Sequence, residues 1–254
     1  MEFDLTKHLQ NICADAPFTV GLAANVLDQQ IRINDQATLP AASLIKLGIA
    51  AYGHTLWEQH AGILLEDIDV TASHMVGGDG VIHLLMPKTY CVQDLLTLML
   101  SLSDNTATNM LIHRFGMTQI NDWLQAHFSG AQLQRDLMSP NDQGDNFITP
   151  DATLQLLQFV LAVDDPYWQV IRRALRHQTN QKKLTYPIAT GEFDGAFMDK
   201  TGELDGLEHD AARLIIGDQY ADCVLMTQFK PGQRHAALAL QEQVGRLVCQ
   251  RLND

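Results

Sequence analysis

The sequence predicts an α/β fold: an antiparallel sheet built from both chain ends and flanked by terminal helices, with a helical subdomain inserted between its halves. Strand-like apolar runs occur near both ends, and the stretch between them has mostly helical periodicity. Strands and helices do not alternate, which disfavours a parallel sheet of βαβ units. We expect one domain over 1–254, with its α/β part at about 1–42 and 188–254 and its helical part at about 43–187.

The N-terminal quarter predicts a helix, a hairpin and a second helix. Apolar residues from Leu5 to Cys13 recur at helical spacing. Two short apolar runs, Phe18–Leu27 and Gln30–Asn34, are joined by two polar residues and predict a β-hairpin. An apolar helix opens near Ser43.

The middle of the chain contains further helical patterns, at Val92–Leu102, Asn105–Phe115, Gln119–Phe128, Pro150–Val163 and Tyr167–His177. Thr149 precedes a proline at the first helical position, which is a common helix start. The stretch 130–149 is rich in Asp, Asn, Ser and Gly, and predicts a long surface loop.

The last quarter predicts strands and a closing helix. Ala196–Thr201 and Ala211–Ile216 flank a glycine-containing turn, and Asp222–Phe229 follows as a third strand. Apolar residues then recur at helical spacing from Ala237 to Leu252, which indicates an amphipathic helix.

Charge and composition exclude several kinds of partner. The 254 residues include 30 acidic and 17 basic side chains, a formal net charge of −13. Nucleic acids are held by clustered Lys and Arg, so we expect no nucleic-acid partner. No apolar run approaches the roughly 18 residues of a membrane span. The acidic start, Met1–Asp4, lacks the apolar segment of a secretory signal and favours a cytoplasmic protein, or a secreted one if the chain was trimmed.

The cysteines indicate neither a metal site nor a disulfide framework. Cys13, Cys91, Cys223 and Cys249 are scattered, without a CxxC or Cys/His cluster. Buried, reduced thiols are the interpretation that fits this spacing. We expect no metal and no cofactor, and we expect the protein to be a monomer.

Three short motifs can carry chemistry. Ser43 and Lys46 are three residues apart, which puts both on one helix face. A lysine among apolar residues can lose its proton near neutral pH and activate a serine hydroxyl. Taken alone, each motif also has a purely structural interpretation. Ser43 and Lys46 could be a helix cap and a surface lysine, and Ser103-Asp104-Asn105 could be a capped helix start. Lys200-Thr201-Gly202 could be the end of a hairpin strand.

The conjunction of the motifs is more specific than any one of them. Each occurs once, in the order Ser-x-x-Lys, Ser-Asp-Asn, Lys-Thr-Gly, a set typical of class A β-lactamases and penicillin-binding proteins. The chain resembles that family more widely. Leu100–Arg114 looks like its central helix, and Pro40–Ser43 like the approach to its nucleophile. Lys200–Leu204 followed by His209-Asp210 is similar to a less characterised branch of class A-like serine hydrolases.

The resemblance implies roles for the first two motifs. Ser43 would be the acylated nucleophile and Lys46 its proton acceptor. Ser103 would relay a proton to the leaving nitrogen, and Asn105 would hold the substrate's amide side chain.

The resemblance also implies the opposite wall of the site. Lys200, Thr201 and Gly202 would meet a substrate carboxylate. The backbone N–H groups of Ser43 and Glu203 would form an oxyanion hole, which suits a tetrahedral intermediate.

The chain departs from the family pattern at two places. Class A β-lactamases carry a glutamate that activates the deacylating water, but no Glu lies between Glu66 and Glu192 here. Arg135 matches the arginine that opens the corresponding loop, and Leu137 falls about where the glutamate should be. Aspartates could substitute for it, namely Asp136, Asp142 or Asp145. The arginine that often binds the substrate carboxylate also has no clear match, and His209 or Arg213 could serve instead.

The sequence therefore predicts a serine hydrolase that forms an acyl-enzyme on Ser43 with a small acyl substrate. That substrate would be a β-lactam or a related amide or ester, and we expect slow deacylation. The alternatives are a penicillin-binding or cell-wall-ligand-binding module without turnover, or a D-Ala-D-Ala carboxypeptidase or esterase.

Overall fold

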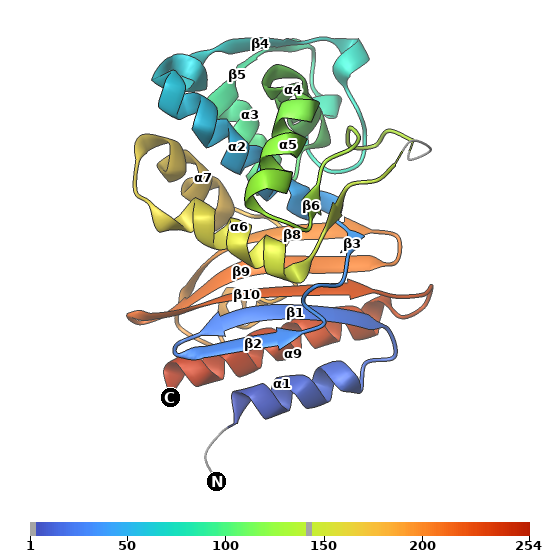
Figure 1. The fold of residues 1–254 in the computed structure, drawn as a ribbon, viewed down its shortest axis with the longest axis vertical. Coiled ribbons are helices and arrows are strands. Elements are labelled where there is room, and N and C mark those ends of the chain that lie inside the picture. Colours follow the sequence, from blue (N-terminus) through green and yellow to red (C-terminus); the bar gives the residue numbers. More distant parts are fainter. Residues whose placement is uncertain (1–3, 141–143) are drawn as a thin grey trace.

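The computed structural model describes residues 4–140 and 144–254. Within these ranges, the main sheet has five antiparallel strands in the order β2-β1-β10-β9-β8 (Figure 1). The strands are β1 (Thr19–Val26), β2 (Gln29–Ile33), β8 (Ala196–Leu204), β9 (Leu207–Ile216) and β10 (Gln219–Gln228). Because β1 pairs with β10 along its whole length, both ends of the chain share one sheet. The predicted fold class is confirmed.

Two terminal helices cover one face of this sheet. They are α1 (Leu5–Ala14) and α9 (Arg234–Asn253), which lie together below the strands in Figure 1. The buried side chains of Leu5 and Leu9 from α1, and of Val244 and Val248 from α9, pack with alternate residues of the strands. The short α8 (Tyr186–Ala189) contacts α9 on the same side.

The helical part covers the other face (Figure 1). It comprises α2 (Ile45–Gln59), α3 (Val92–Ser101), α4 (Asn105–Phe115), α5 (Met117–His127), α6 (Pro150–Ala162) and α7 (Pro166–Arg176). Helices α3 to α7 each agree with the predicted range to within two residues at either end, and α2 begins two residues after Ser43, near which a helix was expected to open. Helix α6 begins as expected, since Thr149 Oγ1 accepts a hydrogen bond from Ala152 N at 3.1 Å and Pro150 is the first helical residue.

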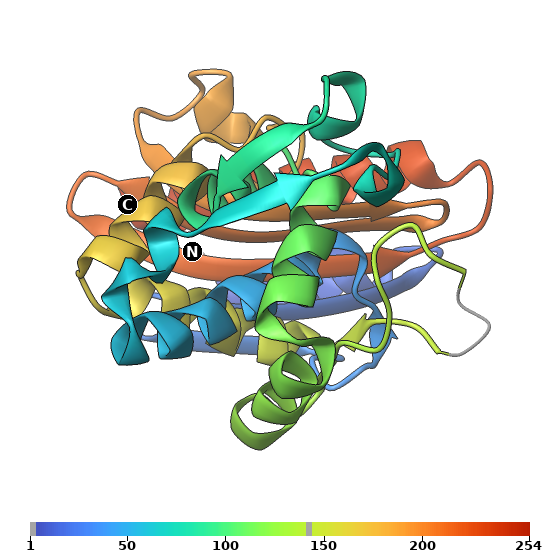
Figure 2. The ribbon, with the colours of Figure 1, turned by 90° about the horizontal axis from the view of Figure 1, so that it is seen from above.

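Short strands inside the helical part are absent from the sequence prediction. β4 (Asp67–Val70) pairs with β5 (Lys88–Cys91), and β3 (Leu39–Pro40), β7 (Phe147–Ile148) and β6 (Ala131–Gln132) form a second small sheet. Seen from above, the β4–β5 ribbon crosses over the helices, and the described part of the segment between β6 and β7 lies to one side of them (Figure 2). The β6–β7 pairing ties both ends of the predicted long loop to the strand before Ser43.

Two further findings concern membrane-spanning helices and the state of the cysteines. Among the described residues, no helix is both long enough and apolar enough to cross a membrane. All four cysteines are free thiols, of which three are buried and Cys91 is partly buried.

Candidate active site

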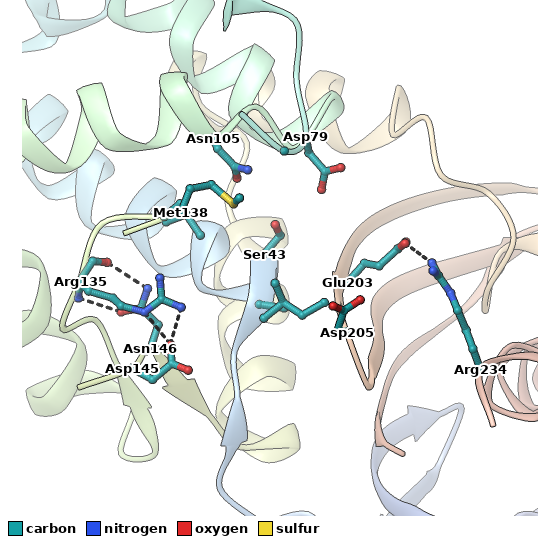
Figure 3. A pocket seen from close by; sticks show the side chains of 14 residues that line it. Ser43, Asp79, Asn105, Arg135, Met138, Asp145, Asn146, Glu203, Asp205 and Arg234 are labelled. Atoms are coloured by element: carbon teal, nitrogen blue, oxygen red, sulfur yellow. Dashed lines mark hydrogen bonds and ion pairs between the residues drawn. The ribbon is translucent and has the colours of Figure 1, made fainter. Parts of the chain in front are cut away.

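Ser43 lies on a single 3₁₀ turn, Ala42–Leu44, between β3 and α2. The preceding residue, Ala42, has φ +46°, a backbone conformation that L-residues rarely adopt outside sites that require it. This turn places Ser43 in the middle of the pocket shown in Figure 3, with its side chain 6% exposed.

Lys46 lies one helical turn after Ser43, at the start of α2, and is fully buried. Its Nζ is 3.0 Å from Ser43 Oγ, 3.1 Å from Ser103 Oγ, 2.6 Å from Ser103 O and 2.9 Å from Asn105 Oδ1. The last two oxygens can only accept hydrogen bonds. A neutral amine can therefore give its two hydrogens to these carbonyl oxygens and keep its lone pair for a serine hydroxyl.

Ser103 and Asn105 reach Lys46 from the connection between α3 and α4. Ser103 has φ +54°, and Asp104 is the N-cap of α4, where its Oδ1 accepts from Ala107 N at 2.9 Å. The second carboxylate oxygen of Asp104 accepts from Val81 N and Ile82 N at 2.7 and 2.9 Å. The middle residue of this motif therefore fixes the backbone around the site rather than facing the pocket.

The third motif lies on β8, next to Ser103 and the turn that carries Ser43. Lys200 is fully buried, and its Nζ donates to Ser103 Oγ at 3.1 Å and to Thr201 O at 2.7 Å. At Gly202 a Cβ atom would lie 3.3 Å from the Cβ of Ala42. The glycine thus lets β8 approach the nucleophile turn closely.

Burial and nearby charges lower the pKa values of the two buried lysines. The pKa of Lys46 is well below its usual value, first because of burial and then because of the charge of Lys200. Burial lowers the pKa of Lys200 to about 8, and Asp199 and Asp79 act in the opposite direction. Burial of Lys46 and the charge of Lys200 both favour a neutral amine at Lys46 near neutral pH, and the neutral amine is the form that can accept a proton.

Arg234, at the first residue of α9, is a pocket residue that sequence reasoning missed. Its guanidinium is ion-paired with Glu203, the residue after Gly202, and both side chains line the pocket (Figure 3). The spacing of α9 predicted a helix but could not indicate that its N-terminus faces the β8–β9 turn. Arg234 is thus an arginine at the pocket, whereas the resemblance left the carboxylate-binding arginine unassigned.

The structure does not bring His209 or Arg213 to the pocket. His209 is fully buried, with Nε2 3.0 Å from Pro40 O and Nδ1 accepting from Thr227 N at 3.2 Å. Burial lowers the pKa of His209 to about 4, so the ring is neutral. Arg213 is paired with Asp222 in the neighbouring strand at 2.6 Å. The expectation that His209 contacts substrate is corrected: its ring joins β9 to β3 and β10.

The loop between β6 and β7 forms the remaining wall. Leu137 and Met138 line the pocket, and the backbone of Leu137 is held at both its N–H and its C=O by the side chain of Asn109, at 2.8 and 3.0 Å. Asp145 lines the pocket too, but Arg135 binds its carboxylate at 2.8 Å.

Of the other two aspartates considered for deacylation, Asp136 lies within the described residues and does not reach this wall. Asp136 accepts from His113 Nε2 at 2.7 Å and is not among the residues that line the pocket. Asp142 lies outside the described residues.

The pocket has a volume of about 420 Å³, which is enough for a small acyl substrate. Ser43 lines this pocket, and its hydroxyl lies 3.0 Å from the amine of the buried Lys46. Behind it, Ser103 lies between that amine and the amine of Lys200. These are the parts that nucleophilic acyl transfer requires: a nucleophile, a base and a proton relay.

Comparisons with known proteins identify the family and agree with the fold. A family model described as "Beta-lactamase enzyme family" matches residues 4–252. The fold is similar to a β-lactamase from Sphaerobacter thermophilus, with 24% identity, TM-score 0.89 and 99% and 98% of the two chains covered. It is also similar to PBP-A (23%, TM-score 0.86, 98% and 96%) and to a class A β-lactamase from Mycobacterium abscessus (16%, TM-score 0.85, 99% and 100%).

A comparison with the sequences of curated proteins finds no match. The family model nevertheless spans nearly the whole chain, including every motif of the site. The chain therefore belongs to the β-lactamase enzyme family and is a serine hydrolase.

Proposed function

We propose that Ser43 is the nucleophile and that Lys46 accepts its proton. The contact that carries this proposal is the 3.0 Å distance between Lys46 Nζ and Ser43 Oγ, in a buried site where the amine favours its neutral form. Ser43 Oγ then forms a bond to the substrate carbonyl carbon as its proton passes to Lys46. The oxyanion is held by the backbone N–H groups of Ser43 and Glu203.

Ser103 supplies the proton to the leaving nitrogen. Its hydroxyl lies between Lys46 and Lys200, 3.1 Å from each, so the proton taken from Ser43 can pass through it. The carbonyl–nitrogen bond breaks as that nitrogen gains the proton, and the acyl group remains on Ser43. Asn105 holds the substrate amide, and Lys200, Thr201 and Arg234 receive its carboxylate.

Deacylation is slow in this proposal. Leu137 and Met138 form the wall where a loop carboxylate would activate water. The carboxylate of Asp145, which also lines the pocket, is ion-paired with Arg135. Loss of a positioned general base costs roughly 10²–10⁴ in rate. One PBP-A structure, a leucine-to-glutamate variant, is an acyl-enzyme complex with penicillin G, which supports the idea that this fold can hold a penicilloyl ester.

Intact-protein mass spectrometry after mixing with penicillin G tests both halves of the proposal. We expect a burst of about one equivalent, a long-lived adduct and a tryptic map that places it on the Ser43 peptide. Leu137→Glu should shorten the lifetime of the adduct by at least about tenfold, whereas the uncharged control Leu137→Gln should not.

Two outcomes would contradict the proposal. An adduct elsewhere, or one that persists in Ser43→Ala, would remove Ser43 from the mechanism. Rapid hydrolysis without a detectable adduct would contradict slow deacylation and point to a loop carboxylate that activates water; Asp145, which lines the pocket, and Asp142 would be the first to substitute.

The class of acyl substrate requires a panel. We propose a β-lactam or a related amide or ester, and the rivals are a D-Ala-D-Ala peptide, a short-chain ester and binding without turnover. A chromogenic cephalosporin, a D-Ala-D-Ala peptide and a short-chain ester, each tested on wild type and Ser43→Ala, separate them. Adduct formation without turnover of any of the three would indicate a binding module.

A further inference from the structure

Arg234 is bound by two carboxylates before any substrate arrives. Its side chain is 55% exposed and is ion-paired with Glu203 Oε1, while its Nε lies 2.7 Å from Glu208 Oε1. Both contacts hold the pKa of Arg234 above its usual value, against the effect of its burial. The positive charge of the guanidinium that lines the pocket is therefore already balanced by carboxylates of the protein.

The two carboxylates differ in how firmly they are held. Glu208 is fully buried, and its other oxygen lies 2.6 Å from the buried Nζ of Lys183, so a second cation matches its charge. The Glu203 side chain is 37% exposed, and among the described residues its one ion-pair partner is Arg234. A long contact of 3.4 Å from Asn180 Nδ2 adds little.

Glu203 can therefore leave Arg234 at small cost. Ion pairs between exposed side chains are weak, because water solvates both charges. Glu203 also lies at the edge of the pocket, at the β8–β9 turn, with Ser43 on the inner side of it (Figure 3). A substrate carboxylate that comes to Arg234 meets the Glu203 carboxylate at the same guanidinium, and the two repel each other.

We propose that the Glu203 side chain is a specificity determinant that competes with the substrate carboxylate for Arg234. The Glu203 side chain must turn towards solvent before the carboxylate of an acyl substrate can bind Arg234. The pocket therefore discriminates against substrates that carry a single negative charge. A substrate without a carboxylate at this place does not meet that competition. This inference rests on the proposed acylation of Ser43 and assigns the side chain of Glu203 a role separate from that of its backbone.

The test compares a chromogenic cephalosporin with its own methyl ester. The measured quantity is the second-order rate of Ser43 acylation for the free acid divided by that for the ester, obtained by intact-protein mass spectrometry. Glu203→Gln removes the charge at nearly constant shape and should raise this ratio by about two- to fivefold. Asp205→Asn makes the same charge change in the same turn, and among the described residues Asp205, which also lines the pocket, forms no ion pair with Arg234. It should raise the ratio by less.

A double-mutant cycle shows whether the effect passes through Arg234. In an Arg234→Ala background, Glu203→Gln should no longer raise the ratio, because the shared partner is gone. An unchanged or lower ratio in Glu203→Gln, an equal rise in Asp205→Asn, or a rise that persists without Arg234 would overturn the inference while acylation itself stands. If neither compound acylates Ser43 in the wild type, the proposed function fails, and this inference fails with it.

Discussion

Lys46 and Lys200 place their Nζ atoms at the same distance, 3.1 Å, from the hydroxyl oxygen of Ser103. Two ammonium groups on one buried hydroxyl repel each other, and burial penalises both charges. The pair therefore favours one neutral amine. The pKa of each lysine is lowered, and Lys46 is the one that also contacts Ser43.

Removal of the Lys46 amine should slow acylation without unfolding the protein. We expect Lys46→Ala to reduce the rate of Ser43 labelling by a fluorescent penicillin by about 10²–10⁴, because the general base is lost. The exposed Lys182 is the matched control, and Lys182→Ala should label at the wild-type rate. Unchanged labelling in Lys46→Ala would mean that another group takes the serine proton.

The His209 ring should matter for stability rather than for substrate. His209→Ala leaves Thr227 N and Pro40 O without their ring partners, which should lower the free energy of unfolding by about 1–3 kcal/mol in urea titrations. A raised KM at unchanged stability would instead support the substrate contact that the sequence predicted.

The carboxyl of Asp210 should make stability depend on pH. Burial raises its pKa to about 7, against Lys183, Lys200 and the backbone N–H of Leu184, and the neighbouring Asp199 is raised in the same way. Because the folded state binds the proton more tightly than the unfolded state, this stabilisation is present below pH 3.8 and is lost as pH rises to about 7.

Asp210→Asn keeps an oxygen for Leu184 N but cannot ionise. Relative to wild type, this variant should therefore gain stability as pH rises from 4 to 8, by roughly 1–4 kcal/mol. Urea unfolding at several pH values measures the difference, and a difference that is the same at every pH would disprove the assignment.

The thiols should be free and should differ in reactivity. A thiol reagent should find four thiols in the denatured, unreduced protein, and finding two would indicate a disulfide. In the native protein Cys91 should react first, since burial raises the pKa of Cys13 to about 11 and that of Cys249 to about 12 and shields both.

Local pattern explains what the sequence could predict. The long helices and the hairpins have their own periodicity and caps, so α6 could be placed from Thr149-Pro150 alone. Three motifs in a fixed order also indicated which residues meet at Lys46, although Ser43 and Ser103 are 60 positions apart. The small strands β3, β6 and β7 were not predicted, because a strand of two residues is too short to show an alternation of apolar and polar side chains.

Contacts that depend on packing could not be predicted. Nothing in the sequence around Arg234 shows that the first turn of α9 reaches the β8–β9 turn. Likewise, His209 follows the Lys-Thr-Gly strand as a family residue would, but its place on β9 buries the ring under β3. Such positions follow from how whole elements pack, and that packing is not encoded in a short window.

The pairing of β1 with β10 has a consequence for how the chain acquires its activity. Thr19 pairs with Gln228, so β1 cannot complete its pairing until β10 has been synthesised, some two hundred residues later in the chain. Until then one edge of β1 is open to other chains. Lys200 likewise reaches Ser103 only when the C-terminal strands have docked. Such non-local closure is slow, and penicillin labelling during refolding would report the last step of assembly rather than the first.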